Sequence, residues 1–314
     1  MKEISSPRVI DEVVLVSPDL SSTIHTLKTI FHHEIWTTNE VTDSSGKTLY
    51  REGINIMNDR KAIRVIEPVS EGTIYDSFLK KNGAGIFGVR ERLSENDFLS
   101  LREHLFNKGV CLTTYADGVM WADLTETLGG YFGFIKDTDD VHPLAESINL
   151  RQFCIVTDNV ERCAEILKEY LFIGPTEIGH SNSRTVTNPV NSDYPDGLPE
   201  FSFLAGMNFY SNMEFEIVQP EKGPLAYFDF LKRRGGTGFH HIKTEVADGK
   251  WQETLDYYYS LGIKDALNGK IGTCGFSNLL TEDMLGFVYE LSDGAPMVAL
   301  PEGYDPYFYP QTDI

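Results

Sequence analysis

The sequence repeats itself, and this internal repeat constrains the fold more than any other feature of the chain. Four segments of the first half match four segments of the second half in the same order. The pairs are IDEVVLVSPDL at 10–20 with LRQFCIVTDNV at 150–160, VIEP at 65–68 with IVQP at 217–220, FLKKNGAGIFGV at 78–89 with FLKRRGGTGFHHI at 230–242, and LTETLGGYFGF at 124–134 with LTEDMLGFVYEL at 280–291. Because 314 residues leave room for two domains, we predict two tandem copies of one domain.

The repeat also predicts where these copies begin and end. We expect a first copy at 1–140, a second at 149–300 and a C-terminal tail at 301–314, with the polar segment DTDDVHPLAES at 137–147 as the linker. Four aromatic residues in the tail predict that it packs against the rest of the protein. Residues 174–199 are rich in Asn, Ser and Pro, which predicts a long loop.

Each half divides into two similar units, in which a short apolar strand is followed by a helix and then by several strands. We predict helices at 160–170, where apolar residues recur on one face, and at 248–262. A third helix is predicted at 94–109, where Ser94 caps the start and Gly109 ends the helix. Four such units predict an α+β fold built from curved, mostly antiparallel sheets.

Composition and charge narrow the classes of partner. With 27 basic and 47 acidic residues the net charge is -20, and the Lys and Arg clusters that bind nucleic acid or anionic membranes are not found. No window approaches the ~18 apolar residues of a membrane helix, and the N-terminus lacks a secretory signal pattern. The four cysteines show no C-x-x-C spacing, which predicts buried, reduced thiols. We therefore expect a cytoplasmic protein, with a homodimer as its candidate assembly.

The second half carries a pattern that resembles a known superfamily. The pattern is FEIVQPEKGPLAYFDFLKRRGGTGFHHIKTEV at 215–246, followed by LGFVYEL at 285–291. It resembles the vicinal oxygen chelate superfamily, which includes glyoxalase I, methylmalonyl-CoA epimerase and extradiol dioxygenases, and the local likeness is to the epimerase. The resemblance is specific over about 150–291 and continues more weakly over the first half. It implies tandem βαβββ modules that form two cupped, mixed-sheet, glyoxalase-like domains.

The resemblance further implies a divalent metal site on four strand positions of the second domain. The residues at these positions are Gln152, Glu216, His241 and Glu290, which resemble the ligand set of glyoxalase I in type and order. Strand side chains alternate between faces, so only one of the adjacent His240 and His241 is expected to point into the cup. One imidazole, two carboxylates and an amide oxygen suit zinc, nickel, cobalt, manganese or iron better than calcium.

Each of these residues also has a purely structural interpretation. A histidine such as His241 in an apolar strand is often part of the core, and Gln152 can be exposed at a strand start. Glu216 has Glu214 as an equally polar neighbour on its face and can be a solvated edge residue. Glu290 lies inside the apolar run GFVYEL, where an unpaired buried carboxylate is costly, so we expect a partner or a metal for it.

The first half offers a different set at the equivalent positions, namely Glu12, Arg64, Gly88 and Gly133. Glycines provide no side-chain ligand, and the guanidinium of Arg64 repels a cation. We therefore predict that the first domain is a degenerate, metal-free copy that serves packing, partner contact or access to the second cup.

A metal site of this kind implies chemistry at two neighbouring oxygens of a small-molecule substrate. The ion stabilises the enediolate that forms when an α-proton leaves, and a carboxylate takes the proton. As the resemblance to glyoxalase I and the epimerase implies, Glu290 is the first candidate base and Glu216 the second, which predicts an epimerase, an isomerase or a glyoxalase-like lyase. One alternative is an extradiol or hydroxyphenylpyruvate-type dioxygenase, although its first ligand would be histidine at position 152. Another is a non-catalytic protein that binds a small ligand.

Overall fold

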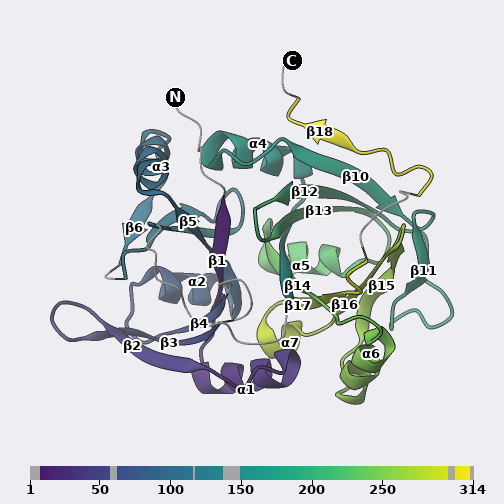
Figure 1. The fold of residues 1–314 in the computed structure, drawn as a ribbon, viewed down its shortest axis with the longest axis horizontal. Helices are drawn as coiled ribbons and strands as arrows, with labels where there is room; N and C mark the ends of the chain where they lie inside the picture. The colour runs from purple at the N-terminus through teal and green to yellow at the C-terminus, as the bar shows by residue number, and fades with distance from the viewer. Residues whose placement is uncertain (1–7, 57–61, 116, 137–148, 296–300, 312–314) are drawn as a thin grey trace.

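The protein was analysed as a computed structural model that describes residues 8–56, 62–115, 117–136, 149–295 and 301–311. In this structure two curled sheets, of eight and ten strands, lie side by side with helices packed on them (Figure 1). The predicted α+β fold of tandem βαβββ modules is confirmed. The predicted linker at 137–147 lies outside the described residues, and the exact domain limits stay predictions.

The first domain consists of two βαβββ modules joined by helix α2. Its sheet has the order β2-β3-β4-β1-β5-β8-β7-β6, with β1 parallel to β4, β5 parallel to β8, and the two modules meeting where β1 and β5 run antiparallel. The elements are β1 (Val9–Val16), α1 (Leu20–Phe31), β2 (Thr37–Thr42), β3 (Thr48–Ile56), β4 (Ala62–Pro68), α2 (Ile74–Asn82), β5 (Gly85–Leu93), α3 (Glu95–Asn107), β6 (Leu112–Thr114), β7 (Met120–Leu124) and β8 (Gly130–Lys136).

The second domain repeats this plan with additions at its edges. Its sheet has the order β11-β15-β16-β17-β14-β9-β13-β12-β10-β18, and its two modules meet where β9 and β14 run antiparallel. The elements are β9 (Asn149–Val156), α4 (Val160–Leu171), β10 (Thr176–Asn182), β11 (Val186–Val190), β12 (Ser202–Phe209), β13 (Glu214–Lys222), α5 (Ala226–Arg234), β14 (Gly238–Glu245), α6 (Trp251–Ser260), β15 (Asp265–Ile271), β16 (Cys274–Leu279), α7 (Glu282–Leu285), β17 (Val288–Ser292) and β18 (Tyr307–Tyr309).

In each half, the helix that follows the first strand begins with the same kind of capping hydrogen bond. Asp19 accepts a hydrogen bond from the backbone N–H of Ser22 at the start of α1, and Asn159 accepts one from Arg162 at the start of α4. Short polar side chains at this position satisfy backbone donors that the first helical turn leaves unpaired. The repeated SPDL and TDNV segments therefore encode the same strand-to-helix turn.

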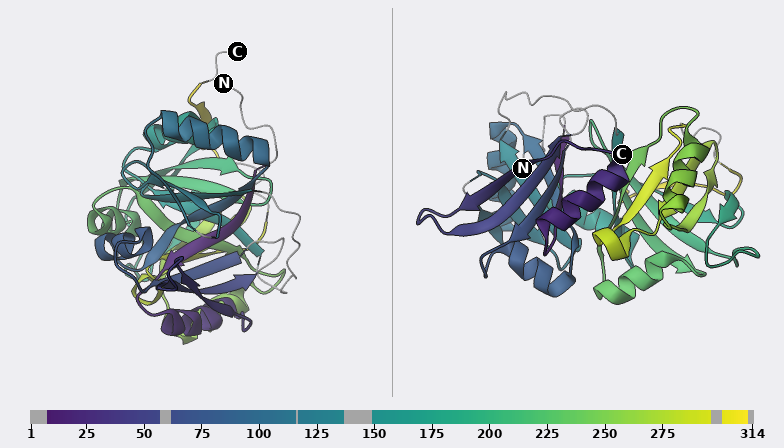
Figure 2. Two further views of the ribbon diagram at one scale, coloured as in Figure 1. Left: turned by 90° about the vertical axis from the view of Figure 1, so that its left-hand side faces the viewer. Right: turned by 90° about the horizontal axis from the view of Figure 1, so that it is seen from below.

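Buried side chains form one shared core and two separate inner cores. The shared core unites the outer faces of both sheets with α1, α3, α4 and α6. The inner face of each curled sheet, called here the N-terminal cup and the C-terminal cup, packs instead against one helix, α2 in the first domain and α5 in the second. The right-hand view of Figure 2 shows α2 and α5 at corresponding places in the two domains.

Contacts between the domains are both apolar and polar. The rings of Phe132 and Phe239 lie 5.8 Å apart. The side-chain amide of Asn212 accepts a hydrogen bond from the backbone N–H of Ile10 at 2.9 Å and donates one to its carbonyl at 2.8 Å. The hydroxyl of Tyr258 on α6 donates to the carbonyl of Ile30 on α1 at 2.6 Å. The two domains are thus joined through a common core.

Most of the predicted elements are present. Ser94 caps α3, α6 lies within its predicted range, and α4 extends one residue beyond its predicted end. In the tail, β18 pairs antiparallel with β10, which confirms that the tail packs against the protein. The loop predicted at 174–199 is wrong, because β10 and β11 lie there and obtain their pairing from β12 and β15. Among the described residues, no helix has the length and apolar character needed to cross a membrane.

Candidate metal centre

Two rows of polar side chains cross the inner face of the second sheet. Strand pairing places Glu216, Cys154 and His241 in register on β13, β9 and β14. The neighbouring row, two residues along the strands, consists of Glu214, Gln152, Lys243, Glu290 and Asn278. The structure therefore brings together all four residues that the sequence predicts for the site.

The side chains converge on the imidazole of His241. Its Nε2 lies 2.8 Å from Oε2 of Glu290, 3.1 Å from Oε2 of Glu216 and 3.4 Å from the amide nitrogen of Gln152. His241 and Gln152 are fully buried, and Glu290 is almost fully buried. Polar groups are held so far from water only when they are paired with one another or with a bound ion.

Lys243 is a fifth member of the cluster that the sequence analysis missed. Its Nζ donates to Oε1 of Gln152 at 2.7 Å and lies 3.2 Å from Oε1 of Glu290. Because an ammonium group only donates and the carboxylate of Glu216 only accepts, these neighbours fix the amide of Gln152 with its oxygen toward Lys243 and its nitrogen toward Glu216. In this arrangement Gln152 positions the carboxylate and presents no oxygen to the centre.

Acidic and basic side chains lie next to one another in this cluster. Burial alone lowers the pKa of His241, but Glu290 and Glu216 outweigh burial and raise the pKa to about 9. Burial raises the pKa of Glu290, but Lys243 and His241 lower it more, so that carboxylate is held in its charged form. His241 and Lys243 thus stabilise the buried carboxylate of Glu290, and Glu214 is a further acidic neighbour of Lys243.

The donor set fits a divalent transition metal. Two ligands bound to one ion at about 2.1 Å and at right angles lie about 3 Å apart, which matches the separations between His241 Nε2 and the two carboxylates. An imidazole and two carboxylates are ligands that such ions share. Binding requires His241 to release its Nε2 proton, because a metal ligand must offer a lone pair.

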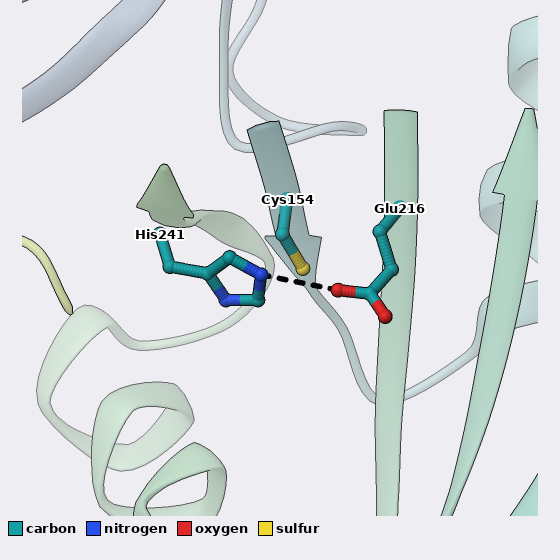
Figure 3. Close-up of side chains that lie close together, drawn as sticks. All are labelled: Cys154, Glu216 and His241. Atoms are coloured by element: carbon teal, nitrogen blue, oxygen red, sulfur yellow. Dashed lines mark ion pairs between the residues drawn. The ribbon is translucent and has the colours of Figure 1, made fainter. Parts of the chain in front are cut away.

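Cys154 stands close to this set as a further potential ligand. Its sulfur, a ring nitrogen of His241 and a carboxylate oxygen of Glu216 all lie within 4.8 Å of one another. Figure 3 shows these three side chains close together. Burial first, and then Glu216 and Glu290, raise the pKa of the Cys154 thiol well above its ordinary value. Without an ion Cys154 is therefore a neutral thiol, as expected from the sequence, but it faces the centre two residues after Gln152.

Strand pairing identifies the positions of the N-terminal cup that correspond to the candidate metal site. Other side chains occupy the space there. Glu12 lies 2.6 Å from Arg64 and 2.9 Å from Arg90, which occupy the places of Glu216 and Lys243. A Cβ added to Gly133 would lie 2.7 Å from the ring of Trp121, which fills the place of the Glu290 side chain. That this domain binds no metal stays a prediction.

The prediction that only one of His240 and His241 points into the cup is wrong. A β-bulge interrupts the pairing of β14 with β9 between Phe239 and His241. As a result, His240 and His241 both lie on the side of the C-terminal cup, and their Nδ1 atoms are 3.0 Å apart. Burial, followed by the proximity of His241, lowers the pKa of His240 well below its ordinary value, so this second imidazole is neutral.

Comparisons with solved structures agree with this architecture. A variant of 4-hydroxymandelate synthase from Streptomyces coelicolor matches with a TM-score of 0.61 at 11% identity over 95% of this chain and 96% of that one. The halotolerant catechol dioxygenase BphC matches with a TM-score of 0.50 at 11% identity over 91% and 86% of the two chains. Methylmalonyl-CoA epimerase from Streptomyces coelicolor covers 42% of this chain and 99% of its own, at 18% identity and a TM-score of 0.34.

These matches concern the fold. The first two cover most of both domains, so the chain shares the overall two-domain fold of these two solved structures. No family model matches the sequence, and no curated protein sequence does so either.

Proposed function

We propose that the protein is a metal-dependent enzyme of the vicinal oxygen chelate type, acting on a small molecule with two adjacent oxygens. The observation that supports it most is the convergence of Glu216, His241 and Glu290 on one point of a buried inner face. Such a concentration of ionisable side chains is costly to bury for packing alone. The filled N-terminal cup makes the second domain the working one.

His241, Glu216 and Glu290 would hold the ion, with Cys154 beside them and Gln152 able to join if its amide turns. When bound, a divalent ion polarises the adjacent substrate oxygens and stabilises negative charge that develops on them. Glu290 is the candidate base for the substrate proton, and Glu216, which lies near the same Nε2 atom of His241, is the second candidate. Lys243 keeps Glu290 charged, and hence able to accept a proton, in the buried site.

This arrangement favours epimerisation, isomerisation or a glyoxalase-like lyase reaction. A proton that leaves and returns on the same carbon needs a carboxylate near the substrate and no external oxidant, and two carboxylates lie within 3.1 Å of His241 Nε2. Dioxygenation is the second candidate, because a structure named as a catechol dioxygenase shares the fold over most of both chains. Gln152 counts against it, since iron sites of that class use two histidines and one carboxylate.

Metal analysis of the purified protein tests the proposal. The wild type should bind about one transition-metal ion per chain, and His241→Ala and Glu290→Gln should each weaken binding. Glu214→Gln is the matched control, because Glu214 lies on the same inner face in the neighbouring row. A wild type that binds no ion, or variants that keep it, would favour a ligand-binding protein without a metal.

Two further assays separate the candidate reactions. Incorporation of deuterium from heavy water into hydroxyketones or acyl thioesters would support proton transfer, whereas oxygen consumption with catechols or aryl α-ketoacids would support dioxygenation. The expectations of a cytoplasmic location and of a homodimer stay predictions.

A further inference from the structure

His240 lies in a box of aromatic side chains next to the candidate ligand His241. Its ring makes edge-to-face contacts with Tyr227 and Phe230 of α5, with centroids 5.1 and 4.9 Å away. The side chain is buried, and its Nε2 has no hydrogen-bond partner among the described residues. A buried nitrogen without a partner lowers stability, so packing alone does not favour a histidine here.

The first domain contains the same box with an apolar residue in it. There the bulge residue of β5 is Phe87, which packs on Tyr75 and Phe78 of α2 with centroids 4.8 and 5.1 Å away. The repeat aligns Tyr75 with Tyr227 and Phe78 with Phe230. A phenyl ring therefore fits this box, and what the imidazole of His240 adds is its Nδ1 atom.

The Nδ1 of His240 lies 3.0 Å from the Nδ1 of His241. One of these two nitrogens therefore carries the proton of the hydrogen bond between them. His241 turns its Nε2 to two carboxylates and a candidate metal site. With an ion bound, Nε2 must be bare, and the single proton of His241 is then on Nδ1. With Nδ1 of His241 protonated, the Nδ1 of His240 is the acceptor.

We infer that His240 is a positioning residue that accepts the Nδ1–H of His241 and thereby aims the Nε2 lone pair of His241 at the metal. The inference rests on the proposed metal site. It requires that His240 carry its own proton on Nε2, among the rings of Tyr227 and Phe230, where an N–H can rest against an aromatic face. Groups that orient a ligating histidine in this way typically contribute about 10–100-fold to metal affinity.

Two substitutions at position 240 separate positioning from packing. His240→Phe copies the residue of the first domain, so the protein should fold, and zinc affinity, measured by competition with a chromogenic chelator, should fall about 10–100-fold. His240→Asn keeps a polar acceptor near the place of Nδ1 and should recover most of that loss. Thr244→Val is the control, because it removes a hydrogen bond on the same strand that points away from the site, toward Tyr289.

The inference is overturned if folded His240→Phe protein binds zinc like the wild type, or if His240→Asn is as weak as His240→Phe. Nitrogen-15 NMR of the imidazoles in the zinc-loaded wild type gives a test that needs no variant. His240 should be protonated on Nε2 and bare on Nδ1, and the opposite tautomer would overturn the inference. A wild type that binds no zinc contradicts the proposed function, whereas zinc binding with the opposite tautomer contradicts only the positioning role of His240.

Discussion

Lys243 in the C-terminal cup and Arg90 in the N-terminal cup occupy the same position of the fold. Lys243 pairs across β14 and β9 with Gln152, and Arg90 pairs across β5 and β1 with Glu12. Each basic side chain binds the residue opposite it, at 2.7 Å in the second domain and 2.9 Å in the first. A cation at this position is therefore common to both cups, whereas the neighbouring ligand positions differ.

In the C-terminal cup, the ammonium group of Lys243 would compete with a metal ion for Glu290 and Gln152. The ammonium of Lys243 lies 3.2 Å from Glu290 and holds the oxygen of Gln152 away from the centre. Lys243→Met should therefore tighten zinc binding about tenfold or more, because a like charge near the ion is removed and the amide of Gln152 can turn. In the metal-free protein the same change should lower the free energy of unfolding by about 2 kcal/mol, since Glu290 loses a charged hydrogen-bond partner.

Zinc titration and urea denaturation in the presence of a chelator measure these two effects. Lys264→Met is the control, because Lys264 is exposed and lies outside the cluster. Weaker zinc binding in Lys243→Met would contradict the competition and would indicate that Lys243 helps to build the ligand set.

The filled N-terminal cup predicts an acid-sensitive stability. Burial alone would raise the pKa of Glu12, but Arg64 and Arg90 lower it from an ordinary 4.5 to about 2. A carboxyl group with a lower pKa in the folded state stabilises the protein above pH 4.5, and this contribution disappears as the pH falls toward 2. The difference corresponds to about 3 kcal/mol at neutral pH.

Glu12→Gln should remove this contribution. Its free energy of unfolding at neutral pH should be lower by about 3 kcal/mol or more, because two buried guanidinium groups lose a charged partner. Its stability should also depend less on pH below 4.5 than that of the wild type. Urea denaturation across this range tests both points, with Glu40→Gln on the exposed strand β2 as the control. Parallel pH profiles for wild type and Glu12→Gln would refute the assignment.

The repeat in the sequence predicted more than the fold class. It aligned Gln152 with Glu12 and Glu290 with Gly133, and strand pairing confirms this equivalence. Alternation also holds along β17, where Tyr289 and Leu291 belong to the shared core and Glu290 between them lies in the C-terminal cup. Periodicity and register suffice for such positions because regular strands carry them.

The remaining features depend on pairing partners that local sequence does not reveal. The bulge at His240 appears only when β14 is paired with β9, so alternation gave the wrong face for this residue. Lys243 was overlooked although the repeat places a basic residue at the same position in both halves. The orientation of the Gln152 amide follows from Lys243 and Glu216, which come from two other strands.

The tail contributes Tyr304 to the C-terminal cup, and Gly179 on β10 makes room for it. A Cβ at Gly179 would lie 2.2 Å from the hydroxyl oxygen of Tyr304, whose side chain is buried. Burial, Glu216 and Glu177 raise the pKa of Tyr304 to about 12, which agrees with a position near the site. Gly179→Ala should therefore displace the ring and lower the free energy of unfolding by about 1–3 kcal/mol, as overpacking does.

A double-mutant cycle measures this contact. If the cost of Gly179→Ala comes from the ring, it should largely vanish when Tyr304→Ala is already present. Limited proteolysis should also cut the tail of Gly179→Ala faster than that of the wild type. Additive effects of the two substitutions would show that Gly179 is needed for another reason.

The two domains should unfold together, because α6 of the second domain donates hydrogen bonds to the last turn of α1 in the first. The hydroxyls of Tyr258 and Tyr257 donate to the carbonyls of Ile30 and Thr29 in the last turn of α1, where helical carbonyls lack partners within the helix. Tyr258→Phe leaves the buried carbonyl of Ile30 unpaired and should lower the free energy of unfolding by about 1–3 kcal/mol.

Calorimetry should show one transition in wild type and variant, at a lower temperature in the variant, because the shared core still joins the domains. Tyr259→Phe, which removes a hydrogen bond inside the second domain to Asp265, is the matched control. Two separate transitions in the wild type would mean that the domains fold independently despite their common core.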